Sequence, residues 1–299
     1  MKVLVFRGGA LGDLILTLPV LASLRNGYTA ADLRLFGVMP HAGLGSPPAN
    51  AVYDLDAAGL APLFVEDGKP DPALLEVIDG ADLALSYLSD PAGTFGSNLR
   101  RWGLKRLVAG PYRMVEPGPH AVEQLAAPLA ALELSVVCPF PKVDIPKLKA
   151  QGRGVDLALH LGSGSSRKNW PWERWRRLVE RLQAEGLVRH FALVTGEADE
   201  MPTRAFLSGW HGGKVDVWDR LPLPELTARL AGCTAFFGHD SGISHLAAAA
   251  GTPVLVLLGP TNPRVWAPRG PRVQVAASAA GQMQALTVDE VLETARTMF

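Results

Sequence analysis

The chain has very little cysteine: Cys138 and Cys233 are the only two among 299 residues. A disulfide framework is therefore not expected, and a reduced, cytoplasmic setting is. A free cysteine most often behaves as a small apolar side chain, so both are expected in the core.

An excess of charge of one sign is also missing. Lys plus Arg and Asp plus Glu each number 29, so the formal net charge is zero. General nucleic-acid binders carry a basic excess, so that class is not expected. The chain also lacks a run of about 18 apolar residues, which a membrane-spanning helix needs. The apolar run 14–24 follows Asp13, and an acid at that point does not fit a secretion signal.

Apolar residues make up 48% of the chain, which allows one large or two medium domains. Short apolar runs alternate with helical patterns along the chain, which predicts α/β domains with parallel sheets covered on both faces. The stretch 139–154 is rich in Pro and Gly and is predicted to be a linker. We expect domains over 1–145 and 146–285. Residues 286–299 form a further helix that is a candidate to pack back on the first domain. The predicted strands are 2–6, 33–38, 83–88, 155–160, 191–195, 215–218, 235–238 and 254–258.

The first motif is RGGALGD, residues 7–13, which follows a strand and opens a helix. A dinucleotide fingerprint would need glycine where Arg7 stands, and no acid follows the second strand, so an NAD site is not expected. A phosphate-binding Walker loop also fails, because no Gly-Lys-Ser/Thr follows. Asp13 has two readings: it stabilises the helix N-terminus, or it acts as a general base. Pro19 is expected to bend or restart the helix.

The second motif is HLGSGSSRKNWP, residues 160–171, between a strand and a helix. Its backbone N–H groups, its hydroxyls and Lys168 are the groups that bind phosphate. The alternative is a solvated surface loop. The tryptophans in and after the motif have the spacing of a buried helix face and are expected in the core.

The third motif is GHDSGISH, residues 238–245, between a strand and a small-residue helix. A helix N-terminus presents free N–H groups and partial positive charge, so Ser241 and Ser244 are candidates to bind phosphate oxygens. His245 either donates a hydrogen bond to a phosphate or is a core histidine. The next strand ends in GPT, residues 259–261, so three loops are expected to converge on one anion site.

Together these motifs resemble the heptosyltransferase family, glycosyltransferase family 9. The matching pieces are RGGALGD with TLP (17–19), KNWP (168–171), and DSGISH (240–245) with GPT (259–261). The resemblance implies a GT-B architecture: two facing Rossmann-like domains, with the acceptor bound by the first and the nucleotide-sugar by the second. It also implies inverting, metal-independent transfer of heptose from ADP-heptose to a lipopolysaccharide core or another surface glycan.

The resemblance implies a cytoplasmic enzyme with peripheral contact to the inner membrane and no cofactor besides the nucleotide-sugar. Asp13 takes the position of the catalytic base, and Lys168 that of the lysine at the donor phosphates. Glu200 lies near the position of an acid on the ribose, although Glu197 competes for it. The other donor-binding candidates are Ser163, Ser165, Ser166, Asp240, Ser241, Gly242, His245, Gly259 and Thr261. The acceptor-binding candidates are Gly12, Arg100, Arg101 and Lys105, and a solvated helix face is the alternative for these three cations.

Two other functions stay open. One is a nucleotide-sugar 2-epimerase on the same architecture, which would need no acceptor surface. The other is a catalytically silent nucleotide-sugar-binding protein, although Asp13 and Lys168 are both present.

Overall fold

The computed structural model describes residues 1–145 and 155–299, which form two compact units. The first unit comprises Met1–Val115 and Pro119–Pro141, and the second comprises Glu116–Gly118 and Lys142–Phe299. The chain thus passes into the second unit near the start of the predicted linker. The remaining linker residues, 146–154, lie outside the described residues.

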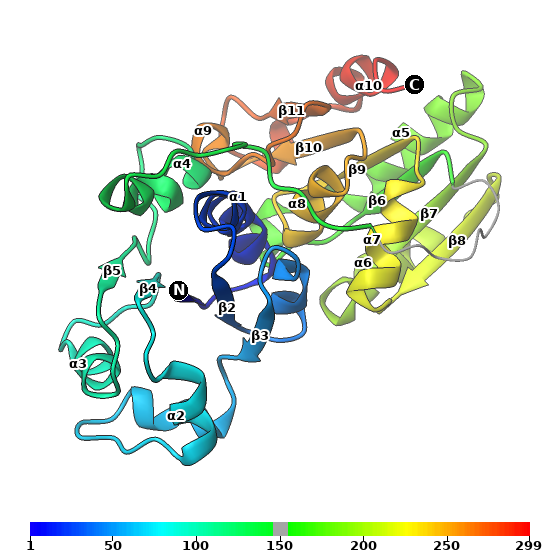
Figure 1. Ribbon diagram of the computed structural model, residues 1–299. Helices are drawn as coiled ribbons and strands as arrows, with labels where there is room; N and C mark the ends of the chain where they lie inside the picture. The colour runs from blue at the N-terminus through cyan, green and yellow to red at the C-terminus, as the bar shows by residue number, and fades with distance from the viewer. Residues whose placement is uncertain (146–154) are drawn as a thin grey trace. The chain divides into compact units, whose positions relative to one another are not determined.

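The first unit contains a parallel sheet in the order β3-β2-β1-β4-β5 (Figure 1). Its central strand β1 is buried from Val3 to Arg7. The strands are β1 (Lys2–Arg7), β2 (Asp32–Gly37), β3 (Ala51–Asp54), β4 (Leu83–Ser86) and β5 (Leu107–Ala109). The helices are α1 (Leu11–Gly27), α2 (Pro72–Ile78), α3 (Thr94–Arg101) and α4 (Ala121–Ala126), with short 3-10 turns between them.

The second unit contains a parallel sheet in the order β11-β10-β9-β6-β7-β8. Its strands are β6 (Leu157–His160), β7 (His190–Thr195), β8 (Lys214–Asp219), β9 (Ala235–His239), β10 (Val254–Leu258) and β11 (Val273–Ala277). Its helices are α5 (Trp172–Ala184), α6 (Glu200–Leu207), α7 (Leu223–Ala231), α8 (Gly242–Ala249), α9 (Pro263–Trp266) and α10 (Val288–Arg296). The predicted fold class, α/β with a parallel sheet in each half, is confirmed.

Three strands were not predicted: β3, β5 and β11. Each lies at an edge of its sheet and is partly exposed along its length. An edge strand needs fewer apolar residues than a central one, so it lacks the continuous apolar run that marked the buried strands.

Helix α1 continues through Pro19, so the helix does not restart there, and the alternative of a bend at this proline stays a prediction. Every residue from Leu14 to Leu21 is buried. A helix that is apolar on all sides is stabilised by burial, and this stabilisation offsets the loss of the hydrogen bond that the proline cannot form.

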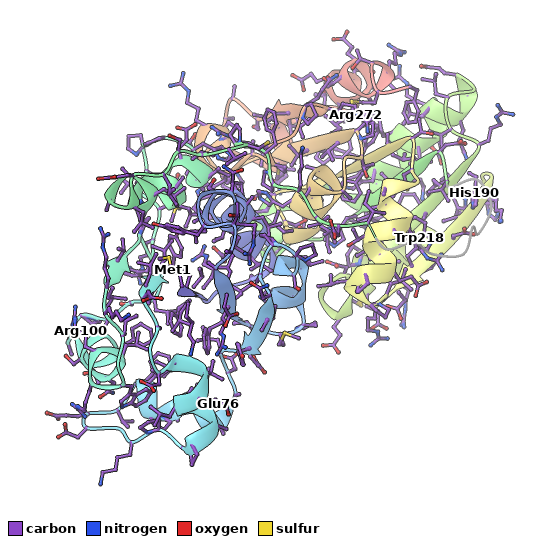
Figure 2. All side chains as sticks on the ribbon, in the orientation of Figure 1. Met1, Glu76, Arg100, His190, Trp218 and Arg272 are labelled. Atoms are coloured by element: carbon purple, nitrogen blue, oxygen red, sulfur yellow. The ribbon has the colours of Figure 1, made fainter. Side chains whose placement is uncertain are left out.

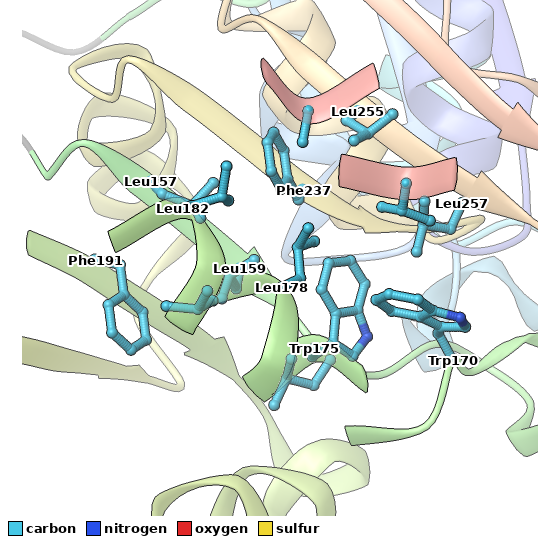
Figure 3. Close-up of a cluster of buried hydrophobic side chains, with 14 of the residues drawn as sticks. Leu157, Leu159, Trp170, Trp175, Leu178, Leu182, Phe191, Phe237, Leu255 and Leu257 are labelled. Atoms are coloured by element: carbon cyan, nitrogen blue, oxygen red, sulfur yellow. The ribbon is translucent and has the colours of Figure 1, made fainter. Parts of the chain in front are cut away.

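The core of the second unit forms where α5 packs on the sheet (Figure 3). Trp170 and Trp175 are 2% and 0% exposed, and their rings meet edge to face at 5.1 Å. These two tryptophans are core residues, as predicted. The two cysteines differ: Cys233 is buried, and burial raises the pKa of its thiol to about 12, whereas Cys138 is only half-buried.

The last helix, α10, packs on α5 and belongs to the second unit. Its apolar face, Val291, Leu292 and Ala295, is buried in the core of that unit. Arg296 at its end forms an ion pair with Glu185 at 2.7 Å. The apolar face of this helix is therefore covered within the second unit, and its packing on the first domain stays a prediction. Within the described ranges, no helix is long and apolar enough to cross a bilayer.

We expect Leu292→Ala to lower the free energy of unfolding by about 2–5 kcal/mol, because it leaves a cavity in a packed core. Leu292 is 1% exposed. Urea unfolding measures the change, with the neighbouring exposed Glu293→Ala as the control. A loss below about 0.5 kcal/mol, typical of a surface site, would show that α10 is not part of this core.

Candidate functional site

Three loops of the second unit meet at the carboxyl ends of neighbouring parallel strands. Strand β9 lies between β6 and β10, so the loops that follow them share one edge of the sheet. Asp240, directly after β9, contacts both of the other loops. Its Oδ2 lies 2.6 Å from Lys168 Nζ and accepts the Thr261 hydroxyl at 2.9 Å. The predicted convergence of the three loops is confirmed.

The Lys168–Asp240 ion pair is partly shielded from water. The side chain of Asp240 is 12% exposed and that of Lys168 is 35% exposed. The carboxylate holds the ammonium group beside the loops while leaving it accessible to an incoming anion. An anion bound here would compete with Asp240 for Lys168, and the role of Lys168 at the donor phosphates stays a prediction.

Ser241 is the N-cap of α8, and its Oγ accepts the N–H of Ser244 at 3.4 Å. Gly242 opens the helix, and His245 is buried one turn into it. The cap fixes the orientation of the helix start, where free N–H groups and partial positive charge favour an anion. The donor-binding roles of these residues stay predictions, as does that of Gly259, which begins the loop after β10 and lies beside Met283.

The serines of the 160–171 loop have different environments. Ser163 Oγ lies 2.6 Å from Asn169 Oδ1, so this hydroxyl closes the loop on itself. Ser165 is half-buried, and Ser166 is exposed at the start of a 3-10 turn, Ser166–Lys168. Of the three predicted phosphate-binding hydroxyls, that of Ser166 is therefore the most accessible.

A buried pair, His160 and Asp199, was not predicted. His160 Nε2 lies 2.8 Å from Asp199 Oδ2, and His160 Nδ1 lies 3.2 Å from Ser241 Oγ. Gly162 is required beside this pair, because a Cβ there would lie 1.4 Å from Asp199 Oδ1. Asp199 comes from a turn after another strand, so no local pattern pointed to it.

The two candidate ribose acids are distinguished by a cavity of about 500 Å³ at the carboxyl ends of β7 and β8. Glu200 lines this cavity and pairs with Arg204 at 3.1 Å. Both side chains are exposed, but Glu197 is not among the residues that line the cavity. Which of the two acids contacts the ribose stays a prediction. The lining also includes Thr195, Gly196, Asp219 and Arg220.

In the first unit, Asp13 lies in the first turn of α1, next to Gly12. Its Oδ2 accepts the N–H of Ala10 at 2.9 Å, and its Oδ1 pairs with Arg7 at 2.8 Å. Gly9 has φ of 98° and a Cβ there would lie 2.5 Å from Asp13 Oδ2, so this turn requires glycine. Asp13 therefore does stabilise the helix start. Its side chain is still 35% exposed, which leaves the carboxylate open to an acceptor.

Arg7 holds the other side of Asp13 in place. The guanidinium is 6% exposed, contacts Thr17 Oγ1 at 3.1 Å and lies over the ring of Tyr87. Burial lowers the pKa of Arg7, whereas the charge of Asp13 raises it. An arginine nevertheless stays charged in proteins, so Arg7 fixes a permanent positive charge beside the carboxylate.

The predicted acceptor cluster of Arg100, Arg101 and Lys105 does not lie beside Asp13. Lys105 Nζ pairs with Asp82 at 2.7 Å, and Asp82 also accepts the backbone N–H of Lys2 at 2.9 Å. This contact is at the amino ends of β1 and β4, whereas Asp13 follows the carboxyl end of β1, roughly 20 Å away by strand length.

Arg100, which is labelled in Figure 2, and Arg101 are at the end of α3, the helix that leads back to Lys105. Arg101 pairs with Asp67 at 2.9 Å. These three cations therefore lie apart from the Asp13 turn, and their acceptor-binding role stays a prediction beside the alternative of a solvated helix face.

The sequence of this chain is similar to those of known heptosyltransferases. A family model described as "Glycosyltransferase family 9 (heptosyltransferase)" matches residues 117–295, more than half of the chain. Lipopolysaccharide heptosyltransferase 1 of Pseudomonas aeruginosa is 34% identical over 163 residues, which are 51% of this chain and 44% of that protein. The chain therefore aligns with less than half of the length of this relative.

Solved structures show the same fold over nearly the whole chain. The E. coli heptosyltransferase WaaC with ADP has a TM-score of 0.77 at 19% identity and covers 100% of both chains. A glycosyl transferase family 9 structure from Veillonella parvula has a TM-score of 0.77 at 18% identity, covering 99% of this chain and 96% of that one. With the motifs, the loop convergence and the family match together, this chain belongs to glycosyltransferase family 9, the heptosyltransferase family.

Proposed function

We propose that this protein is an inverting glycosyltransferase that moves heptose from ADP-heptose to a lipopolysaccharide-core or other surface-glycan acceptor. The observation that carries the proposal is the contact of Lys168 and Thr261 with Asp240 beside the start of α8. It gathers a cation, hydroxyls and helix N–H groups at one edge of a parallel sheet, where ligands of such folds bind. The family match, and the ADP present in the similar structure of E. coli WaaC, support the choice of ADP-heptose as the donor.

The proposed donor site is in the second unit. When the bond from the anomeric carbon to the diphosphate breaks, its electron pair leaves on the phosphate oxygen, which gains negative charge. Lys168, the hydroxyls of Ser166 and Thr261, and the N–H groups at the start of α8 stabilise that charge. Glu200, which lines the cavity, accepts hydrogen bonds from the ribose hydroxyls.

The proposed acceptor site is in the first unit, around Gly12 and Asp13. A sugar hydroxyl is a poor nucleophile at neutral pH, so it needs a base to accept its proton as the new bond forms. The Asp13 carboxylate takes that proton, and the acceptor oxygen attacks the anomeric carbon opposite the leaving diphosphate. A single displacement of this kind inverts the anomeric configuration.

The family match favours this reaction over the nucleotide-sugar 2-epimerase and the silent binding protein. We also propose a cytoplasmic setting with peripheral contact to the inner membrane, where a glycolipid acceptor is available, and no cofactor besides the nucleotide-sugar. Calorimetric titration of the purified protein with ADP-, GDP-, UDP- and CMP-sugars tests the donor. Preference for a nucleotide other than ADP would overturn the choice of ADP-heptose.

We expect donor turnover to need no divalent metal, because Lys168 and the helix N-termini neutralise the diphosphate. The second half of the sequence carries no Asp-x-Asp motif. The motif Asp54-Leu55-Asp56 is in the first unit, where Asp54 Oδ1 accepts the N–H of Asp56 at 3.2 Å. Turnover in excess chelator measures the dependence. Activity that chelator abolishes and magnesium or manganese restores would contradict this expectation.

A further inference from the structure

His239 is a buried histidine that the proposed reaction does not use. It ends β9, directly before Asp240, and is 0% exposed. Its ring meets the ring of Trp175 edge to face, with centroids 5.3 Å apart. The ring is therefore held in one orientation by the core of the second unit.

The two ring nitrogens of His239 have different backbone partners. The N–H of Trp170 lies 2.8 Å from Nε2, and the carbonyl oxygen of Gly162 lies 3.3 Å from Nδ1. An N–H can only donate a hydrogen bond and a carbonyl oxygen can only accept one. Nε2 is therefore unprotonated and accepts, and Nδ1 carries the proton and donates. Desolvation by burial lowers the pKa of His239 to about 3, so the ring stays in this neutral tautomer at physiological pH.

These two contacts bracket the 160–171 loop. Gly162 precedes its serines, and Trp170 follows Lys168 and Asn169. Inside this span, Ser163 and Asn169 close the loop at 2.6 Å. Asp240, the residue after His239, holds Lys168 from the other side at 2.6 Å. Two consecutive residues thus fix the loop, one through both ends of its backbone and one through its lysine.

We infer that His239 is a positioning residue that holds the 162–170 backbone in the one conformation that directs Lys168 at the donor diphosphate. The inference rests on the proposed function and adds a residue that does not touch the substrate. A lysine on a flexible stem binds phosphate more tightly when its backbone is fixed beforehand, because less conformational entropy is lost on binding.

A double-mutant cycle with ADP as the probe tests this role. His239→Leu removes both hydrogen bonds and keeps an apolar side chain in the core. We expect calorimetry to show ADP binding about tenfold weaker than in the wild type. In a Lys168→Ala background the same change should weaken binding by less than about twofold, because the lysine that it positions is gone. His239→Gln, whose amide can accept and donate at similar positions, should restore most of the affinity.

The outcomes separate the two claims. An equal loss of ADP affinity in both backgrounds, or no loss for His239→Leu, would overturn the positioning role and leave the proposed function intact. Failure of ADP to bind the wild-type protein would overturn the proposed function and this inference with it. If the leucine variant does not fold, His239→Asn replaces it in the cycle, since this shorter side chain cannot reach both backbone partners.

Discussion

Asp13→Asn is expected to lower turnover by about 10²–10⁴-fold, the typical contribution of a general base. Asparagine keeps the size of the side chain, and its amide oxygen can still accept the N–H of Ala10, but it cannot take the acceptor proton. Affinity for the donor should stay within about twofold, because Asp13 is in the first unit and the donor motifs are in the second. Steady-state kinetics with calorimetry measures both quantities.

The same substitution also affects stability, so a matched control is needed. Arg7 would lose its charged partner. A buried hydrogen-bond donor that loses its acceptor lowers the free energy of unfolding by about 1–3 kcal/mol. Asp71 is the N-cap of α2 and accepts the N–H of Leu74 at 2.7 Å, so Asp71→Asn alters a helix start away from the proposed chemistry. We expect the control to lose stability and keep its turnover. If Asp13→Asn behaves in the same way, Asp13 only stabilises its helix and is not the base.

Lys168→Ala is expected to weaken binding of the nucleoside diphosphate by about 10–150-fold and to slow transfer. A charge-assisted contact to phosphate contributes roughly 1.5–3 kcal/mol, which corresponds to that range. Asp240 would also lose its cation while keeping the hydroxyl of Thr261, so the site becomes more repulsive to an anion. Calorimetry with ADP gives the affinity.

Lys214→Ala is the matched control for this change. Lys214 is also paired with an aspartate of the second unit, Asp216 at 3.9 Å, but it lies at the amino end of β8 and is 72% exposed. We expect its ADP affinity to match the wild type. Wild-type affinity in Lys168→Ala as well would show that Lys168 is an ordinary surface cation and that the 160–171 loop is not the phosphate loop.

The sequence predicted the buried part of the fold well. Central strands such as β1 and β10 are continuous apolar runs, because helices cover both faces of a parallel sheet. The motif loops were placed correctly for the same reason, since each follows such a strand. The edge strands were missed because a strand with one neighbour is only partly buried, so it need not be a continuous apolar run.

Contacts between distant residues were the part of the site that could not be predicted. His160 and Asp199 are 39 residues apart, and His239 is 77 residues from Gly162. Each pair forms because parallel strands bring their carboxyl ends to one edge of the sheet.

Release of nucleoside diphosphate from ADP-heptose, with and without a lipopolysaccharide inner-core acceptor that lacks heptose, tests the central claim most directly. Mass spectrometry follows both the nucleotide and the acceptor. We predict that ADP is released only when the acceptor is present, and that the acceptor gains one heptose residue. Conversion of the nucleotide-sugar without any acceptor would indicate an epimerase. Tight binding of ADP-heptose with no ADP release on any acceptor would indicate a silent binding protein, and either result would contradict the account.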